Sequence, residues 1–316
     1  MSSIAGPFQF KITILQNSQD KVVVKQNGIA KPDWLKVKFP AGENYRRIDQ
    51  YHRIQGLNSV CRSAACPNQG ECWNKGTATF MILGNNCTRT CSFCNIGNHP
   101  TESPDPLEPQ KVAKAIAELQ LNHAVITSVT RDDLPDGGAG HFATLVREIK
   151  STSPDCTIEL LIPDLQGNHQ ALATILQEVP HILGHNLETV PRLYSQVRPE
   201  ADYQRSLDVL TQARELAPKV ITKSGLMLGM GEEYAEVIAA LHDLRKHDCQ
   251  IVTLGQYLAP TRDHYPLKRY VTPEEFADLA AYGKRLGFDH VEAGPLVRSS
   301  YHAEEQFAAG RTQPHG

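Results

Sequence analysis

Three cysteines within eight residues constrain this chain more than any other feature. Cys87, Cys91 and Cys94 are separated by three and then by two residues. Thiols this close together cannot all face one core from a helix or a strand, so we expect a loop that wraps around a ligand. Short spacings of this kind are typical of loops whose thiolates hold a cubic iron–sulfur cluster. Such a cluster has four irons, so three cysteines leave one iron open to bind and reduce a small molecule.

Two plainer interpretations of these eight residues stay open. Structural zinc normally takes four ligands, and His99 could supply the fourth. Disulfides are the other alternative. Met1–Phe10 does not have the pattern of a signal peptide, so eight cysteines indicate reduced thiols and a cytoplasmic protein, in which metal binding is more common than disulfides.

The overall composition excludes several classes of protein. The chain has 316 residues, of which 41% are hydrophobic, and this fits one large α/β domain or two small ones. A net charge of −3 without a basic run gives no indication of nucleic-acid binding. No apolar run of about 18 residues occurs, so we expect no membrane-spanning helix. We also expect a monomer.

A second group of three cysteines precedes the first. Cys61, Cys66 and Cys72 lie in a segment rich in Pro, Asn and Gly, which predicts a loop. Residues 77–84, between the two groups, are β-branched and apolar and predict a buried strand. A rigid strand favours two separate sites, one at each end, over a single site with six thiols. The other two cysteines, Cys156 and Cys249, stand alone and are interpreted as buried small hydrophobic residues.

From residue 77 onward, apolar segments alternate with amphipathic ones. We predict strands at 77–84, 123–130, 157–162, 181–187, 220–228, 251–258 and 290–293, and helices near 112–119, 141–150, 168–178, 203–216, 233–246 and 273–286, the last with Thr272 as N-cap. This alternation predicts βα units and a parallel sheet. Six full units predict an α/β fold, an incomplete (β/α)6 TIM-type barrel, with functional groups at the carboxyl ends of its strands.

Extensions flank this predicted barrel. We assign residues 1–75 to an N-terminal extension that carries Cys61, Cys66 and Cys72, residues 76–295 to the barrel, and residues 296–316 to a C-terminal segment. Residues 11–25 predict one or two short strands within the first extension.

The spacing CxxxCxxC, with the aromatic Phe93 before the last cysteine, resembles the radical S-adenosylmethionine (SAM) superfamily. The resemblance implies a cluster on Cys87, Cys91 and Cys94 whose open iron chelates SAM, and Phe93 against the adenine. Residues 225–232 resemble the GxIxGxxE pattern of that superfamily, with Met227 in place of Ile. Its GGE motif is absent, and residues 131–138 stand there instead, so the contact to the SAM amino group is expected within residues 130–133.

Polar residues at strand ends are further candidates. Asn186 and Glu188 are suited to ribose hydroxyls. Glu159 and Lys223 lie in or just after apolar strands, where a charge is costly unless it is paired. Either a ligand or a mutual salt bridge would satisfy them. The candidates for SAM binding are therefore Phe93, Thr130, Glu159, Asn186, Glu188, Lys223, Gly225 and Gly229.

The spacing of Cys61, Cys66 and Cys72, together with the sequence Arg298-Ser299-Ser300-Tyr301, narrows the resemblance to the lipoyl synthase family. It extends from about Trp34 to the C-terminal segment. The resemblance implies a second, auxiliary 4Fe–4S cluster on the three cysteines and Ser300, consumed as a source of two sulfur atoms. A hydroxyl is a harder donor than a thiolate and a poorer match for a cubane, so it is a ligand that can leave. The Ser-Ser pair by itself indicates only an exposed turn.

The implied substrate is an octanoyl chain on a lysine of a lipoyl carrier domain, either 2-oxoacid dehydrogenase E2 or the glycine cleavage H protein. The implied reaction is radical sulfur insertion at C6 and C8, in which the catalytic set is Cys87, Cys91, Cys94 and Ser300. A ferredoxin or flavodoxin would supply electrons. Two alternatives stay open: a radical SAM methylthiotransferase, against which the lack of a basic C-terminal domain counts, and a structural zinc or electron-transfer protein, for which six βα units are more scaffold than needed.

Overall fold

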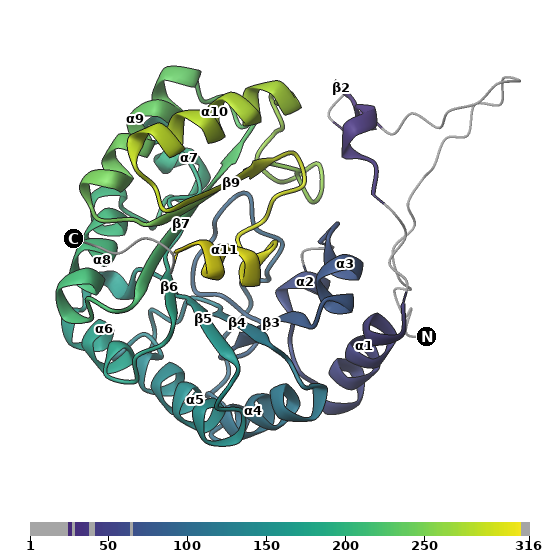
Figure 1. The fold of residues 1–316 in the computed structure, drawn as a ribbon, viewed down its shortest axis with the longest axis vertical. Helices are drawn as coiled ribbons and strands as arrows, with labels where there is room; N and C mark the ends of the chain where they lie inside the picture. Colours follow the sequence, from purple (N-terminus) through teal and green to yellow (C-terminus); the bar gives the residue numbers. More distant parts are fainter. Residues whose placement is uncertain (1–24, 27–28, 38–41, 64–65, 311–316) are drawn as a thin grey trace, which may run out of the picture.

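The computed structural model describes residues 25–26, 29–37, 42–63 and 66–310, and a sheet of seven parallel strands is its central feature (Figure 1). The strands lie side by side in the order of the sequence. They are β3 (Thr77–Ile82), β4 (His123–Ser128), β5 (Thr157–Leu161), β6 (Ile182–Gly184), β7 (Ile221–Leu228), β8 (Ile251–Gln256) and β9 (His290–Gly294). Because β3 and β9 are the two edges of this sheet, the barrel is incomplete, as predicted.

Six helices cover the outer face of the sheet (Figure 1). They are α4 (Glu108–Leu119), α5 (Ala139–Thr152), α6 (His169–Leu176), α8 (Tyr203–Leu216), α9 (Tyr234–Lys246) and α10 (Pro273–Leu286). Each follows one of the strands β3 to β8, so the six predicted βα units are confirmed, with β9 as a seventh strand.

Local sequence explains these elements. All six residues of β3 are buried, as expected for a parallel strand covered on both faces. Helix α10 begins at the predicted N-cap, where the hydroxyl of Thr272 accepts a hydrogen bond from the Glu275 amide at 3.2 Å and the Glu275 carboxylate accepts one from the Thr272 amide at 3.1 Å. Gly287 ends the helix in a left-handed conformation.

The segment before the barrel is more helical than the sequence predicts. Helix α1 (Glu43–Gln55) was not predicted. The loop expected around Cys61, Cys66 and Cys72 is wrong in part, because this segment contains the short helices α2 (Val60–Ser63) and α3 (Gln69–Asn74). The physical reason is tertiary packing. Trp73 is fully buried, and its ring stacks on Tyr45 at 5.4 Å and lies 5.4 Å from the ring of His52.

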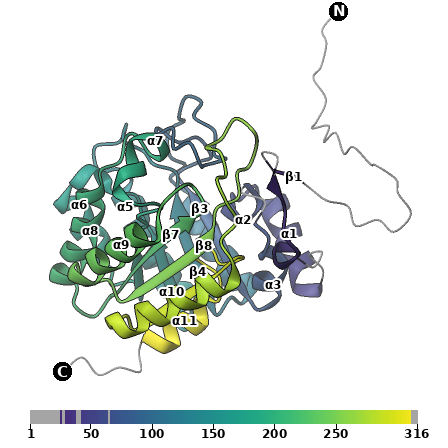
Figure 2. The same cartoon turned by 90° about the horizontal axis from the view of Figure 1, so that it is seen from above.

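The last helix, α11 (Ala303–Gly310), lies at the amino ends of the strands, opposite α7 (Tyr194–Val197) (Figure 2). Its Phe307 packs on Ile182, Ile221 and Ile251, each at or near the start of a strand. The remaining short elements are β1 (Lys25–Gln26), β2 (Ile29–Ala30), η1 (Asp33–Leu35), η2 (Leu165–Gly167) and η3 (Pro191–Leu193). Residues 11–24 of the predicted N-terminal strands lie outside the described residues.

No helix among the described residues is long and apolar enough to cross a membrane.

Candidate active site

A cavity of about 590 Å³ occupies the inside of the barrel toward the carboxyl ends of the strands. Five of the predicted thiol ligands and most of the predicted polar residues border it. They are Cys61, Cys66, Cys87, Cys91, Cys94, Phe93, Thr130, Asn186, Glu188, Gly225 and Ser300. The sequence predicts two sites at opposite ends of β3, whereas the structure brings thiols of both groups, all but Cys72, to one cavity.

The first group of thiols lies in the loop after β3. The amide of Arg89 donates to the sulfur of Cys87 at 3.4 Å, and the amide of Ile96 donates to the sulfur of Cys94. Burial raises the pKa of Cys91 to about 12 and that of Cys94 to about 11, and the neighbouring thiols of the group add to both shifts. Buried thiols that receive backbone hydrogen bonds gain most from a positively charged metal centre, which stabilises the thiolate.

A buried arginine clamps this loop to the barrel. Arg89 donates to Asp132 through Nε at 2.7 Å, and to Asp164 through Nη2 at 2.6 Å. Burial opposes ionisation of Asp164, but the hydrogen bonds and charge of Arg89 outweigh it and lower the pKa of Asp164 to about 2. Asp133 is paired in the same way, with Arg131 at 2.8 Å. Three of the four residues considered for the SAM amino group, Arg131, Asp132 and Asp133, are therefore engaged within the protein, and Thr130 borders the cavity.

The second group of thiols comes from α2, α3 and the residues between them. Burial raises the pKa of Cys66 to about 11 and that of Cys72 to about 12. Cys61 raises the pKa of Cys66 further, and both other thiols raise that of Cys72, so the three lie close together. The amides of Asn68 and Gln69 donate to the sulfur of Cys66. Cys72 borders a small second cavity of about 20 Å³.

Neither group of thiols converges on one point. Across the described residues, no three His, Cys, Asp or Glu side chains are close enough to hold a single metal ion. A cubane distributes its thiolates over separate irons, so three neighbouring, mostly half-buried thiols fit a cluster at each group. All eight cysteines are free of disulfides, which excludes the disulfide interpretation for this structure.

The loop after β9 brings Ser300 to the same cavity. Its backbone passes so close to β8 that a Cβ on Gly255 would collide with the carbonyl oxygen of Val297. Asn186 then donates to the hydroxyl of Ser299 at 2.8 Å. Ser300 is the next residue and borders the cavity. Burial, followed by the charges of Glu71, Cys72 and Glu292, raises the pKa of Tyr301 to about 12, which places this side chain beside the second group of thiols.

Polar groups at the end of β6 border the other side of the cavity. Asn186 donates to Glu188 at 3.1 Å, and Glu188 has a left-handed backbone with φ of 65°. Burial raises the pKa of Glu188, although the charge of Arg198 and the hydrogen bond from Asn186 oppose the shift.

Arg198 is a residue that the sequence did not reveal. It is 7% exposed and borders the cavity. Its Nη1 donates to the carbonyl oxygens of Asn186 at 2.8 Å and Leu187 at 3.0 Å, while its buried Nε has no hydrogen-bond partner among the described residues. A single arginine before Pro199 has no spacing pattern that could have identified it.

Three predicted SAM contacts lie outside the cavity lining. Lys223 and Glu159 form a buried ion pair at 2.6 Å, and His123 lies 3.2 Å from the same carboxylate. This ion pair is the mutual salt bridge that the sequence left as an alternative. Gly229 donates its amide to Glu232 at 2.5 Å, so this motif stabilises its own turn.

Comparisons with known proteins agree with this arrangement. The sequence profile of the radical SAM superfamily matches residues 81–244. Among solved structures, the hydrogenase maturase HydG has a TM-score of 0.55 at 14% identity over 74% of this chain and 54% of its own, and methylornithine synthase has a TM-score of 0.52 at 14% identity over 76% of this chain and 74% of its own. Both share the fold alone. The chain is a radical SAM enzyme, and membership implies a 4Fe–4S cluster and SAM as cofactors.

Curated relatives narrow the class to one family. A lipoyl synthase of Methylococcus capsulatus is 53% identical over 281 residues, which are 89% of this chain and 87% of the relative. A lipoyl synthase of Chlorobium limicola is 52% identical over 280 residues, 88% of this chain and 96% of the relative. The chain belongs to the lipoyl synthase family.

Proposed function

We propose that this chain inserts two sulfur atoms, at C6 and C8, into an octanoyl group carried on a lysine of a lipoyl carrier domain. The observation that carries this proposal is that five of the six thiols, from both groups, border one cavity together with Ser300, and that Cys72 lies beside Cys61 and Cys66. When bound, the cluster on the first group and SAM supply an abstractor of hydrogen atoms, and the auxiliary cluster supplies sulfur. The target C–H bonds are unactivated, so a general base could not remove their protons.

The residues around the first group are suited to holding SAM. Cys87, Cys91 and Cys94 leave one iron of a cubane without a protein ligand. Asn186 and Glu188 offer an amide and a carboxylate to ribose hydroxyls. Arg198 presents a buried guanidinium to the same space, and a guanidinium is the natural partner of the SAM carboxylate.

The rest of the cavity wall suits a fatty acyl chain. It is apolar along the strands β3 to β7, where Met81, Val125, Leu161, Ile162 and Leu226 border it. These side chains would hold an octanoyl chain between the two groups of thiols and exclude water from it. Each carbon could then lie within reach of both groups, as double insertion requires.

Ser300 completes the second group in this proposal. Its hydroxyl would be the fourth ligand beside Cys61, Cys66 and Cys72, and the weakest of the four, because a hard oxygen donor matches an iron–sulfur cubane poorly. A ligand that leaves easily opens the cluster for sulfur transfer. We further propose the octanoylated E2 and H-protein carrier domains as partners, and a ferredoxin or flavodoxin as reductant.

Chemical analysis and mass spectrometry test this function together. Anaerobically reconstituted protein should hold about eight irons per chain, for two cubanes. Incubation with SAM, a reductant and an octanoylated carrier peptide should add two sulfur atoms to the peptide. A lone cluster, or zinc in place of iron, would contradict the proposal.

A triple variant separates the two groups of thiols. Replacement of Cys61, Cys66 and Cys72 by Ala should abolish sulfur insertion while SAM cleavage persists, because the first group is untouched. If cleavage is lost as well, in a variant that still holds about four irons, the two groups do not act separately.

A further inference from the structure

A set of polar contacts joins the neighbours of two proposed ligands. Glu71 directly precedes Cys72 in α3, and Tyr301 directly follows Ser300. The hydroxyl of Tyr301 donates to Oε2 of Glu71 at 3.1 Å. The contact therefore connects α3 to the C-terminal loop at the position where one proposed ligand from each must meet.

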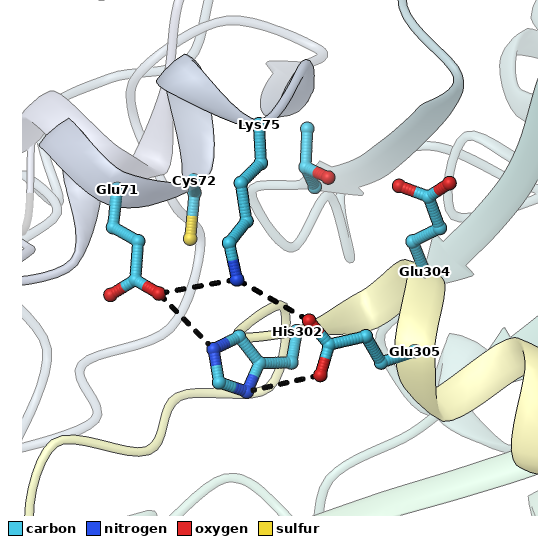
Figure 3. Close-up of a pocket in the computed structure, with 7 residues that line it drawn as sticks. Glu71, Cys72, Lys75, His302, Glu304 and Glu305 are labelled. Carbon is cyan, nitrogen blue, oxygen red and sulfur yellow. Dashed lines mark hydrogen bonds and ion pairs between the residues drawn. The ribbon is translucent and has the colours of Figure 1, made fainter.

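Three further side chains extend this contact, as Figure 3 shows. Oε1 of Glu71 lies 3.3 Å from Nζ of Lys75 and 3.3 Å from Nε2 of His302. Nζ of Lys75 in turn lies 3.3 Å from Oε1 of Glu305. We call Glu71, Lys75, Tyr301, His302 and Glu305 the latch. Glu71 lies in α3 and Lys75 directly follows that helix, whereas the other three members come from residues 301–305.

The latch is weaker than the anchors on either side of it. The side chains of Glu71 and Lys75 are 46% and 49% exposed, and water screens ion pairs at such positions. By contrast, Val297 before it is buried, and Phe307 after it packs on the first residues of β6, β7 and β8. The ends of the loop are thus fixed by apolar packing, while its centre depends on polar contacts.

The backbone within the latch is also unusual. His302 has a left-handed conformation with φ of 54°, which few residues other than glycine adopt. Such a conformation persists where surrounding contacts determine it. The carboxylates of Glu71 and Glu292 supply those contacts, at 3.3 and 3.7 Å from the two ring nitrogens.

We propose that the latch positions the hydroxyl of Ser300 beside Cys72, so that both can serve the auxiliary cluster, and that its weakness lets the hydroxyl leave when sulfur is removed. Glu71 and Tyr301 are positioning residues in this scheme and touch neither SAM nor substrate. The inference rests on the proposed function, because it assigns a role at the second group of thiols.

Removal of one hydroxyl tests the latch. Tyr301→Phe should speed the loss of iron from the auxiliary cluster to a chelator, measured anaerobically without SAM, by about three- to tenfold. The variant in which Cys61, Cys66 and Cys72 are replaced by Ala lacks the auxiliary cluster. The phase of iron loss that is missing from this variant is therefore the one that belongs to the auxiliary cluster. Tyr51→Phe is the matched control, since the Tyr51 hydroxyl donates to Glu118 on another surface.

The same substitution made in a Ser300→Ala protein shows whether Tyr301 positions the Ser300 hydroxyl or only stabilises the protein in general. In a Ser300→Ala protein the hydroxyl is already gone, so Tyr301→Phe should add no further acceleration. Glu71→Gln is a second variant, which keeps an acceptor but loses the charge, and it should accelerate iron loss less than Tyr301→Phe does.

Two results would overturn the latch. One is an unchanged rate of iron loss in both Tyr301→Phe and Glu71→Gln, and the other is equal acceleration with and without Ser300. If about eight irons are present and either result occurs, the latch alone is wrong. If only about four irons bind to the unaltered chain, the proposed function fails and the latch fails with it.

Discussion

At the scale of single residues, the cavity depends on a few groups whose neighbours define what they can do. Arg198 is buried, bonded to two carbonyl oxygens and adjacent to Glu188. Ser300 borders the same cavity as five of the thiols. Each differs chemically from its surroundings, so a substitution at either residue has a specific expected effect on SAM binding or on turnover.

Arg198→Lys should weaken SAM binding by about tenfold, because lysine keeps the charge but loses the planar fork that pairs with a carboxylate. The Kd for SAM, measured by equilibrium dialysis on reconstituted protein, gives the answer. Arg192→Lys is the control, since Arg192 is half exposed and pairs with Glu236 at the surface. Unchanged SAM affinity in Arg198→Lys would remove this residue from the proposed SAM site.

Ser300→Cys should retain the auxiliary cluster but lose turnover, because a thiolate ligand leaves less readily than a hydroxyl. Iron content measures whether the cluster is retained, and the mass of the carrier peptide measures whether sulfur is inserted. Ser103→Cys, at an exposed position outside the cavity lining, controls for the added thiol. Normal lipoyl formation by Ser300→Cys would refute the role of the hydroxyl as a leaving ligand.

At the scale of elements, the strands and helices of the barrel could be predicted from the sequence, whereas the helices that precede the barrel could not. The strands and helices from Thr77 onward follow from local periodicity and capping, as in α10 with Thr272. Helices α1 and α3 were missed because they are stabilised by contacts between distant residues, such as Tyr45 with Trp73. The local sequence around Cys61, Cys66 and Cys72, rich in Pro, Asn and Gly, indicates a loop.

The residues of the candidate site also divide into those that local sequence identifies and those that it does not. Cys87, Cys91 and Cys94 are recognisable from spacing alone, because one loop contains them all. Ser300 was identified only through resemblance to a family, since nothing in a Ser-Ser pair indicates a ligand. Arg198 was not identified at all. Its role depends on the approach of a loop to the end of β6, which no short segment encodes.

The junction between β8 and the C-terminal loop makes a testable element. Gly255→Ala should lower the free energy of unfolding by about 1–3 kcal/mol, because the new Cβ must displace the Val297 carbonyl. Denaturant unfolding of the apoprotein measures this. Gly184→Ala, also in a strand, is the control, since its Cβ would meet only ordinary contacts of 3.4 Å or more. Equal stability of the two variants would show that the loop does not press on β8.

At the scale of the whole molecule, two buried histidines link stability to pH. Burial, and then the charge of Arg62, lowers the pKa of His52 to about 4, with Asp49 opposing. Burial, and then the charge of Arg198, lowers the pKa of His185 to about 4 as well. Because the unfolded chain takes up these protons near pH 6.5, folding stability should fall as the pH falls from about 6.5 to 4 and change little above that range.

His52→Phe should remove part of this dependence. The ring packs on Trp73 and Phe80, so an aromatic replacement keeps the contacts and loses the proton site. The free energy of unfolding of the variant, minus that of the unaltered chain, should be about 2 kcal/mol higher at pH 5 than at pH 8. Urea unfolding of both apoproteins at the two pH values measures the difference, and the exposed His169→Gln is the control. If the two proteins differ in free energy of unfolding by the same amount at pH 5 and at pH 8, the lowered pKa of His52 is contradicted.

The hydrogen bond between Glu71 and Tyr301 spans 230 residues, and this distance has a consequence for biosynthesis. A ribosome adds Cys61, Cys66 and Cys72 long before it adds Ser300, which comes only after the last strand of the barrel. In the proposed function, the second group of thiols therefore lacks one of its four donors throughout that interval, whereas the first group has its complete set of three cysteines once Cys94 is added. We expect a polypeptide that ends just ahead of Ser300 to keep SAM cleavage and to lose sulfur insertion, because it lacks the proposed fourth donor.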